Sequence, residues 1–260
     1  MFKSILIFIL FSLVNAHFRP ERQLDYNSTV IDCSRFKRSA FQHACVLAPE
    51  SMEGPYFIHE DLVRSNITDG KPGVPLTLDI VITAADVCLP ISGAKVYVWH
   101  CDNRGYYSGF TQYSPDKKAP DDRGLEVYIG DEKRFFRGVQ TTDEHGKVRY
   151  QTIYPGYYYG RAVHIHVEVY IGGNAIYVGQ LYFPENLNEK IEKVEAYANR
   201  ITKRTLNKDD HIYKAKSGEL TTLELDGNLK GFKTSIVLGI DPSNRSTAKA
   251  STVTPTSATV

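Results

Sequence analysis

Short stretches in which apolar and polar residues alternate dominate the middle of this 260-residue chain. The clearest cover residues 76–82, 95–99, 147–153 and 164–169, and Gly, Pro, Asn and Asp residues separate them. Successive side chains of a strand point to opposite faces, so this alternation predicts strands that each bury one face. Several such strands joined by turns predict an all-β fold, with a β-sandwich or β-barrel core.

One segment after these strands has helical periodicity instead. Leu187, Ile191 and Val194 recur at intervals of three and four residues, and the acidic Glu185 stands near the start. We therefore expect a helix over residues 186–200 that caps the sandwich.

The two ends of the chain differ in composition from the strand-rich middle. Residues 1–16 combine Lys3, an apolar stretch and a terminal Ala16, which predicts a secretory signal peptide. The apolar stretch is shorter than the ~20 residues that span a bilayer, so we expect cleavage before His17 and a secreted protein without membrane attachment. We expect an N-terminal arm over residues 17–44, one folded domain over 45–242, and a disordered Ser/Thr-rich tail over 243–260.

The mature chain has four cysteines, an even number that in a secreted protein predicts two disulfides. Three pairings of Cys33, Cys45, Cys88 and Cys101 are possible. Pairing Cys33 with Cys45 and Cys88 with Cys101 closes the shortest loops and therefore costs the least entropy. A zinc site is the alternative, but none of these cysteines has the two-residue spacing of a zinc knuckle.

Three Asn-x-Ser/Thr triplets agree with passage through a secretory pathway that attaches glycans, and they begin at Asn27, Asn66 and Asn244. The formal net charge is only +1, and no basic patch is interleaved with aromatic residues. We therefore expect no nucleic-acid partner.

Residues 154–166 read Tyr-Pro-Gly-Tyr-Tyr-Tyr-Gly-Arg-Ala-Val-His-Ile-His and combine phenols, a guanidinium group and two imidazoles. His164 and His166 flank Ile165, which we expect to point outward, on a predicted strand, so both imidazoles point to the same face. Two converging imidazoles make half of a metal site. Strands also carry polar alternation without any ligand role, so the pair alone leaves both interpretations open.

Three other segments accompany this pair: residues 49–57, which contain Glu-Gly-Pro; residues 98–110, which contain Gly-Tyr-Tyr-Ser-Gly; and residues 136–148. Together, and in this order, they resemble the intradiol ring-cleaving dioxygenases, the family of the catechol and protocatechuate enzymes, and most closely its small secreted branch. The resemblance extends from about Cys45 to the strand near Leu238.

This resemblance implies a β-sandwich that holds one non-haem Fe(III) ion per chain. In the family, two tyrosinates and two histidines bind the iron, and here they correspond to Tyr107, Tyr158, His164 and His166. Tyr158 lies three residues before Arg161, where the family places a tyrosine that substrate displaces. Its neighbours Tyr157 and Tyr159 lie four and two residues before Arg161.

The resemblance also implies a pocket for catechol-type aromatic diols, which the family cleaves with dioxygen to cis,cis-muconate products. The implied pocket residues are Met52, Pro55, Tyr56, Arg161 and Gln180, and Arg161 together with Tyr158 would take part in catalysis. Residues 207–213 also match the family, and we expect them to be structural. Secretion makes detoxification of environmental or dietary phenolics a reasonable role for an enzyme that we expect to be a monomer.

The chemistry of the donor set is consistent with ferric iron. Phenolate and imidazole are good donors to a trivalent ion, and a bound metal lowers the pKa of a tyrosine far below its usual value of ~10. Two phenolates favour Fe(III) over Fe(II), and no carboxylate stands at a spacing that would complete a two-histidine-one-carboxylate site.

Two other kinds of protein remain possible from the residues alone. A secreted β-sandwich that binds phenolics or glycans without turnover would also be rich in aromatic residues. A zinc or copper hydrolase could use the two histidines with His100 as the third ligand. We favour a packing or supporting role for His100, and a turn-forming role for Asp102.

Overall fold

The computed structural model describes residues 30–31 and 45–247 of the chain. The predicted signal peptide, nearly all of the N-terminal arm with Asn27 and Cys33, and most of the Ser/Thr-rich tail lie outside these residues. No helix within the described residues is long and apolar enough to span a membrane.

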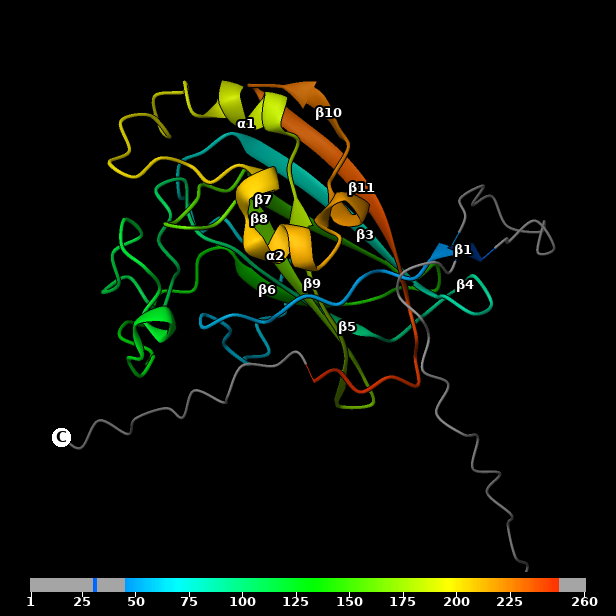
Figure 1. Cartoon of the computed structure of the whole chain (residues 1–260). Coiled ribbons are helices and arrows are strands. Elements are labelled where there is room, and N and C mark those ends of the chain that lie inside the picture. Colours follow the sequence, from blue (N-terminus) through cyan, green and yellow to red (C-terminus); the bar gives the residue numbers. More distant parts are fainter. Residues whose placement is uncertain (1–29, 32–44, 248–260) are drawn as a thin grey trace, which may run out of the picture.

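Two sheets form the body of the protein, and a pair of two-residue strands lies beside them (Figure 1). The five-stranded sheet consists of β10 (Leu225–Asn228), β11 (Gly231–Ile240), β3 (Pro75–Ala84), β4 (Leu89–Pro90) and β7 (Lys147–Ile153). The four-stranded sheet consists of β6 (Arg137–Thr141), β5 (Lys95–Trp99), β8 (His164–Ile171) and β9 (Asn174–Tyr182). The additional pair consists of β1 (Val30–Ile31) and β2 (Cys45–Val46). All pairings are antiparallel except that of β11 with β3, which is parallel.

The main core lies between the two sheets, and it is built by the predicted alternation. Every second residue of β3 points into it, as do alternate residues of β5 and β8. These side chains are Leu76, Leu78, Ile80, Ile82, Val96, Val98, Ile165, Val167 and Val169. The β-sandwich prediction is therefore confirmed.

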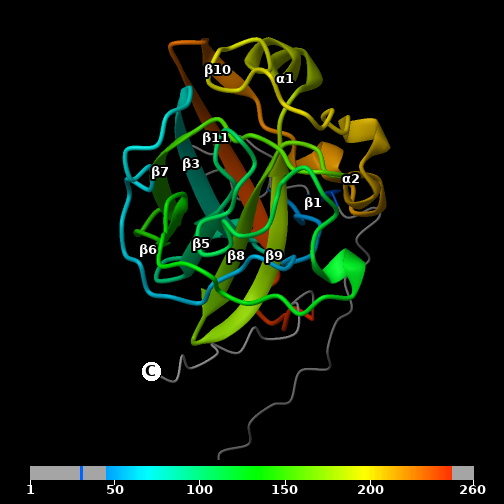
Figure 2. The same cartoon turned by 90° about the vertical axis from the view of Figure 1, so that its left-hand side faces the viewer.

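The outer face of the four-stranded sheet carries the residues between those core positions. Trp99 and Tyr97 of β5 belong to a second, separate apolar cluster, together with Tyr56, Tyr107 and Tyr158 from loops. In Figure 2 the four-stranded sheet lies nearer to the viewer and the five-stranded sheet lies behind it. Loops therefore cover the outer face of this sheet, and side chains on that face lie buried between the sheet and the loops.

The helices are short. They are α1 (Glu185–Ile191), α2 (His211–Ala215) and the 3-10 turns η2 (Asp121–Arg123), η3 (Asn207–Asp209) and η4 (Gly218–Thr221). Both views place α1 beside β10 and α2 beside β9 (Figures 1 and 2).

The helix expected over residues 186–200 ends at Ile191, so its predicted length was wrong. Beyond that point the carbonyl of Ala196 accepts a hydrogen bond from the Asn103 amide, and the carbonyl of Ala198 accepts one from the Arg104 guanidinium. These bonds from a distant loop replace the ones that would continue a helix.

The expected pairing of Cys88 with Cys101 was also wrong. Cys101 is a buried free thiol, whereas Cys88 is disulfide-bonded. Cys88 lies in the turn between β3 and β4, and Cys101 lies beyond the far end of β5. Five residues of extended strand span roughly 16 Å, and bonded cysteines need Cα atoms within about 7 Å.

Candidate metal centre

His164 and His166 lie on β8 and point to the buried outer face of the four-stranded sheet. Each side chain is 2% exposed. The Nδ1 of His164 donates to the carbonyl of Ala162 at 2.7 Å, which leaves the lone pair of its Nε2 free. That Nε2 lies 3.0 Å from the Nε2 of His166. The two imidazoles therefore converge, as the alternation of the strand predicted.

The hydroxyl of Tyr107 completes a triangle of donor atoms. It lies 3.2 Å from the Nε2 of His166 and 3.5 Å from the Nε2 of His164. Atoms that share one metal ion at roughly 2 Å lie about 3 Å from one another. The three donor atoms are therefore spaced as ligands of a single ion.

The loop after β5 presents Tyr107 through a tight turn. The carboxylate of Asp102 accepts hydrogen bonds from the backbone N–H groups of Arg104 and Tyr106, so Asp102 forms the turn expected of it. Gly105 has a positive φ of 93°, and a Cβ atom there would lie 2.2 Å from the carbonyl oxygen of Tyr157. Only glycine fits at this position.

Of the three consecutive tyrosines, Tyr158 faces the histidines. Its ring centroid lies 5.6 Å from that of His164 and 5.7 Å from that of Tyr107. Tyr157 instead donates to the carbonyl of Thr202, and Tyr159 is exposed. The Tyr158 hydroxyl accepts a hydrogen bond at 3.2 Å from Nη1 of Arg161, so it is held away from the triangle of donor atoms.

Aromatic rings fix the orientation of two of the donors. Tyr56 stacks on Tyr107 with ring centroids 4.7 Å apart. Trp99, which pairs with His166 across β5 and β8, stacks on its imidazole at 4.7 Å with planes 8° apart. Rings held in this way lose little conformational freedom when an ion binds.

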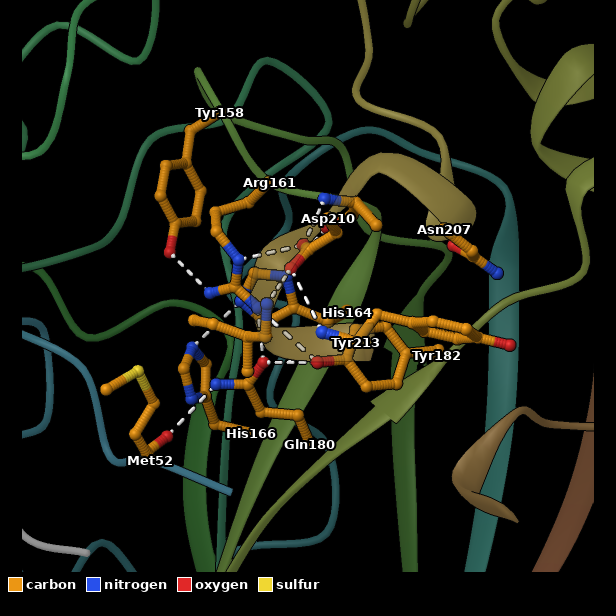
Figure 3. A network of polar contacts seen from close by, with 12 residues as sticks. Met52, Tyr158, Arg161, His164, His166, Gln180, Tyr182, Asn207, Asp210 and Tyr213 are labelled. Atoms are coloured by element: carbon orange, nitrogen blue, oxygen red, sulfur yellow. Dashed lines mark hydrogen bonds and ion pairs between the residues drawn. The ribbon is translucent and has the colours of Figure 1, made fainter. Parts of the chain in front are cut away.

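Arg161 lies at the centre of a buried polar network (Figure 3). Its Nε donates to Oδ2 of Asp210 at 2.9 Å, and its Nη2 donates to Oε1 of Gln180. The hydroxyl of Tyr182 donates to the same Gln180 oxygen at 2.9 Å. Arg161 thus keeps its positive charge inside the protein, and its pKa is raised by the nearby Tyr158 and Asp210 despite burial, which lowers it.

Sequence reasoning did not identify Asp210 as part of the site. Its Oδ1 accepts from the backbone N–H groups of Ile212 and Tyr213, so it caps α2, and its Oδ2 binds both Arg161 and the N–H of Ala162. An aspartate directly before a short helix predicts a cap. Nothing in that local pattern indicates a second bond to a residue 49 positions away.

A cleft of about 210 Å³ opens beside Tyr158 and Arg161. Met52 and Pro55, two of the predicted pocket residues, line it as well. The other two do not line this cleft: Gln180 lies behind Arg161 and donates to the carbonyl of Met52, and Tyr56 packs on Tyr107.

Burial sets the protonation of the donors. It raises the pKa of Tyr107 well above its usual value and that of Tyr158 to about 12, and it lowers the pKa of His164 and His166. Neutral imidazoles are the form that binds metals. Burial disfavours the charged phenolate, but a highly charged cation beside it lowers the pKa of the phenol and favours the anion. A donor set with two tyrosines is therefore suited to iron(III).

His100 does not join this centre. Its Nδ1 donates to the carbonyl of Cys101 at 2.7 Å, and its Nε2 lies 2.6 Å from the hydroxyl of Thr152. Burial lowers its pKa to about 4. No group of three or more His, Cys, Asp or Glu side chains within the part of the chain that the structure covers could hold a metal ion. The hydrolase alternative therefore lacks its third histidine.

The fold and the site together define a β-sandwich protein with histidine and tyrosine donors on the loop-covered face of one sheet. No family model matches the chain. Solved structures are similar to it. The intradiol ring-cleavage dioxygenase from Tetranychus urticae is 35% identical, with a TM-score of 0.72 over 78% of this chain and 98% of that one. The dioxygenase domain of a dioxygenase–carbohydrate-binding fusion from Streptomyces sp. SirexAA-E is 25% identical, with a TM-score of 0.54 over 75% and 98%.

A curated relative agrees with these structures. Catechol 1,2-dioxygenase 1 of Acinetobacter lwoffii is 27% identical over 112 residues, which are 41% of this chain and 31% of that protein. The match therefore spans about a third of the curated relative's length. The chain belongs to the intradiol ring-cleavage dioxygenases, a family of non-haem iron enzymes. It is an enzyme of that class, which excludes a binding module without turnover.

Proposed function

We propose that this protein is a secreted Fe(III) intradiol dioxygenase that cleaves catechol-type diols with dioxygen to cis,cis-muconate products. The observation that carries the proposal is the triangle formed by the Tyr107 hydroxyl and the Nε2 atoms of His164 and His166. The cleft beside Tyr158 and Arg161 supports it, because a small aromatic molecule there would lie next to Tyr158, whose ring centroid is 5.6 Å from that of His164.

In this proposal Tyr107, Tyr158, His164 and His166 hold one ferric ion. When bound, the ion would supply Lewis-acid chemistry that withdraws electron density from a catechol and prepares its ring for reaction with dioxygen.

Two features suit Tyr158 to a proton-accepting role. Its hydroxyl lies 3.2 Å from the Arg161 guanidinium, and burial raises its pKa to about 12. If the ion holds Tyr158 as a phenolate, its release would leave a strong base in this buried position, which would take a proton from a catechol hydroxyl as the substrate enters. The guanidinium then binds the neutral phenol, so Tyr158 stays away from the other donors.

Arg161 stabilises negative charge on the bound substrate. Its side chain is 6% exposed, and Asp210, Gln180 and Tyr182 hold it in one orientation. A fixed guanidinium in a site with little water stabilises a developing oxyanion without reorganisation.

Secretion is part of the proposal. A disulfide at Cys88 and an exposed sequon at Asn66 support it, because both modifications belong to the secretory pathway. Asn244 is a poorer acceptor, since its Nδ2 already donates to the carbonyl of Ile176. A chain that begins at His17 and is recovered as a monomer from the medium of expressing cells would support this part; retention in the cytosol would contradict it.

The direct test of the function is the visible spectrum of the purified protein, recorded before and after catechol is added without oxygen. We expect a tyrosinate-to-iron band that shifts to longer wavelength when catechol binds, and ring cleavage once air is admitted. His166→Ala is the matched variant, and we expect it to lose both the band and the activity.

A colourless protein that remains colourless after reconstitution with iron would contradict the ferric site. A coloured protein that binds catechol and consumes no oxygen would contradict the reaction while leaving the iron site in place.

A further inference from the structure

The cleft beside Tyr158 changes in polarity from its deep end to its opening. Arg161 and Tyr158 line the deep end and are each 6% exposed. Asp121 and Asp122 of η2 line the same cleft and are exposed, so they stand at its opening. Apolar side chains line the walls as well: Met52, Pro55, Ala119 and Ile212.

The two carboxylates at the opening are uncompensated. Neither Asp121 nor Asp122 forms an ion pair with another described residue, and the Asp121 carboxylate accepts hydrogen bonds from backbone N–H groups, including that of Asp122. Arg161 is the only Lys or Arg among the residues that line the cleft, and Asp210 already pairs with its guanidinium at 2.9 Å. Both charged side chains that line the opening are therefore acidic, and Arg123, the basic residue next to them on η2, forms no ion pair with either.

The surroundings of Asp121 favour a cation. Partial burial raises the pKa of its carboxyl, and the charge of Asp122 adds to that rise. Backbone N–H groups offset part of this cost but bring no full positive charge. A ligand cation between the two carboxylates would lower the energy of both charged groups.

We propose that the enzyme selects catechols whose side arm carries a cationic group, and that Asp121 and Asp122 bind that group while the diol reaches the deep end of the cleft. The inference rests on the proposed catechol dioxygenase function and adds the charge of the substrate to it. An arm with a carboxylate would meet two like charges at the opening and would be disfavoured.

Three catechols with a two-carbon arm test this selection: dopamine, ethylcatechol and dihydroxyphenylacetate, which are cationic, neutral and anionic. The measurement is kcat/KM from oxygen uptake, corrected for autoxidation. We expect dopamine to exceed dihydroxyphenylacetate by roughly tenfold or more, and the Asp121→Asn/Asp122→Asn double variant to reduce that ratio by roughly tenfold.

Ethylcatechol separates charge selection from general damage, because damage to the pocket lowers all three values and leaves their ratios unchanged. Asp226→Asn is the control variant: Asp226 is an exposed residue of β10 that does not line the cleft, and its removal should leave the ratio at the wild-type value.

A wild-type enzyme that treats the three substrates alike or prefers the anion would overturn the inference, as would a double variant that keeps the wild-type ratio. Such results would leave the dioxygenase function intact. Absence of oxygen uptake with all three catechols would overturn the proposed function itself, and the charge selection with it.

Discussion

Each donor atom of the centre is held by a neighbour that is not itself a donor. The carbonyl of Ala162 orients His164, the Trp99 indole stacks on His166, and the Tyr56 ring stacks on Tyr107. Preorganised donors bind an ion without first losing rotational freedom. Tyr158 is the exception, since a charged side chain holds its hydroxyl, and this difference agrees with its proposed departure when substrate binds.

Replacing Asp210 should disturb the orientation of Arg161 without affecting iron binding. Asn is nearly the same size as Asp and is an equally good helix cap, so Asp210→Asn can keep α2. It removes the charge beside Arg161 and replaces the oxygen that accepts from Arg161 and Ala162 with an amide donor. Breaking a buried ion pair costs about 3 kcal/mol of folding stability, and a misplaced guanidinium lowers kcat by about 100-fold. We expect iron content and the tyrosinate band to stay at wild-type levels while kcat falls.

The variant Asp209→Asn provides the control, because Asp209 is an exposed residue on η3 next to Asp210. It should retain wild-type kcat. If Asp210→Asn also retained wild-type kcat, then Gln180 and Tyr182 would suffice to hold Arg161, and Asp210 would act only as the cap of α2.

Strand periodicity accounts for most of what could be predicted from the sequence. A period of two fixes which residues share a face, so the convergence of the two histidines follows directly from the pattern. The expectation that Ile165 points outward was wrong, because Ile165 packs in the main core between the two sheets. The pairing of His166 with Gln180 depends instead on the register between β8 and β9, which contains an irregularity between Val169 and Tyr170. Only the family resemblance could place that glutamine in the site.

Contacts between distant elements account for the predictions that failed. The bonds from Asn103 and Arg104 that end the helical segment early come from a loop more than 90 residues away. The buried environment of the free Cys101 is likewise a product of packing, not of spacing. Local propensity is a weak guide wherever tertiary contacts compete with it.

Two sheet strands are joined by an ion-pair cluster that should make stability depend on pH. Asp79 of β3 pairs with Arg149 at 2.6 Å and with Lys147 at 2.7 Å, both on β7, and these partners lower the pKa of its carboxyl although burial opposes the shift. A lowered folded-state pKa means that the stabilisation is present above the usual value of about 4 and is lost as pH falls through the folded value.

Asp79→Asn should therefore lower the free energy of unfolding by about 1 kcal/mol at about pH 7, and by less at about pH 3. Urea unfolding at the two pH values measures the difference. The exposed Asp86→Asn serves as the control, because Asp86 lies in the turn after β3 and has no ion pair with a described residue. An equal loss at both pH values would show that the carboxylate of Asp79 acts through packing and not through charge.

At the scale of the whole molecule, the proposed iron ligands come from three separate segments of the chain. Tyr107 lies on the loop after β5, Tyr158 on the loop after β7, and the histidines on β8. Each loop contributes a tyrosine to the small cluster on the outer face of the four-stranded sheet, and the loop after β7 also places Tyr154 and Tyr157 in the main core. An ion bound by all three segments would therefore stabilise the folded state as a whole.

Iron removal should lower the melting temperature. A ligand at 100 times its dissociation constant adds about 2.7 kcal/mol to folding stability, which for a domain of this size corresponds to roughly 5–10 °C. Differential scanning calorimetry of the iron-loaded and chelator-treated protein measures this shift, and adding ferric iron back should restore it. The double variant His164→Ala/His166→Ala should melt at one temperature with or without iron. A shift of equal size in that variant would mean that iron binds elsewhere, and no shift in the wild-type protein would mean that the donor triangle does not hold it.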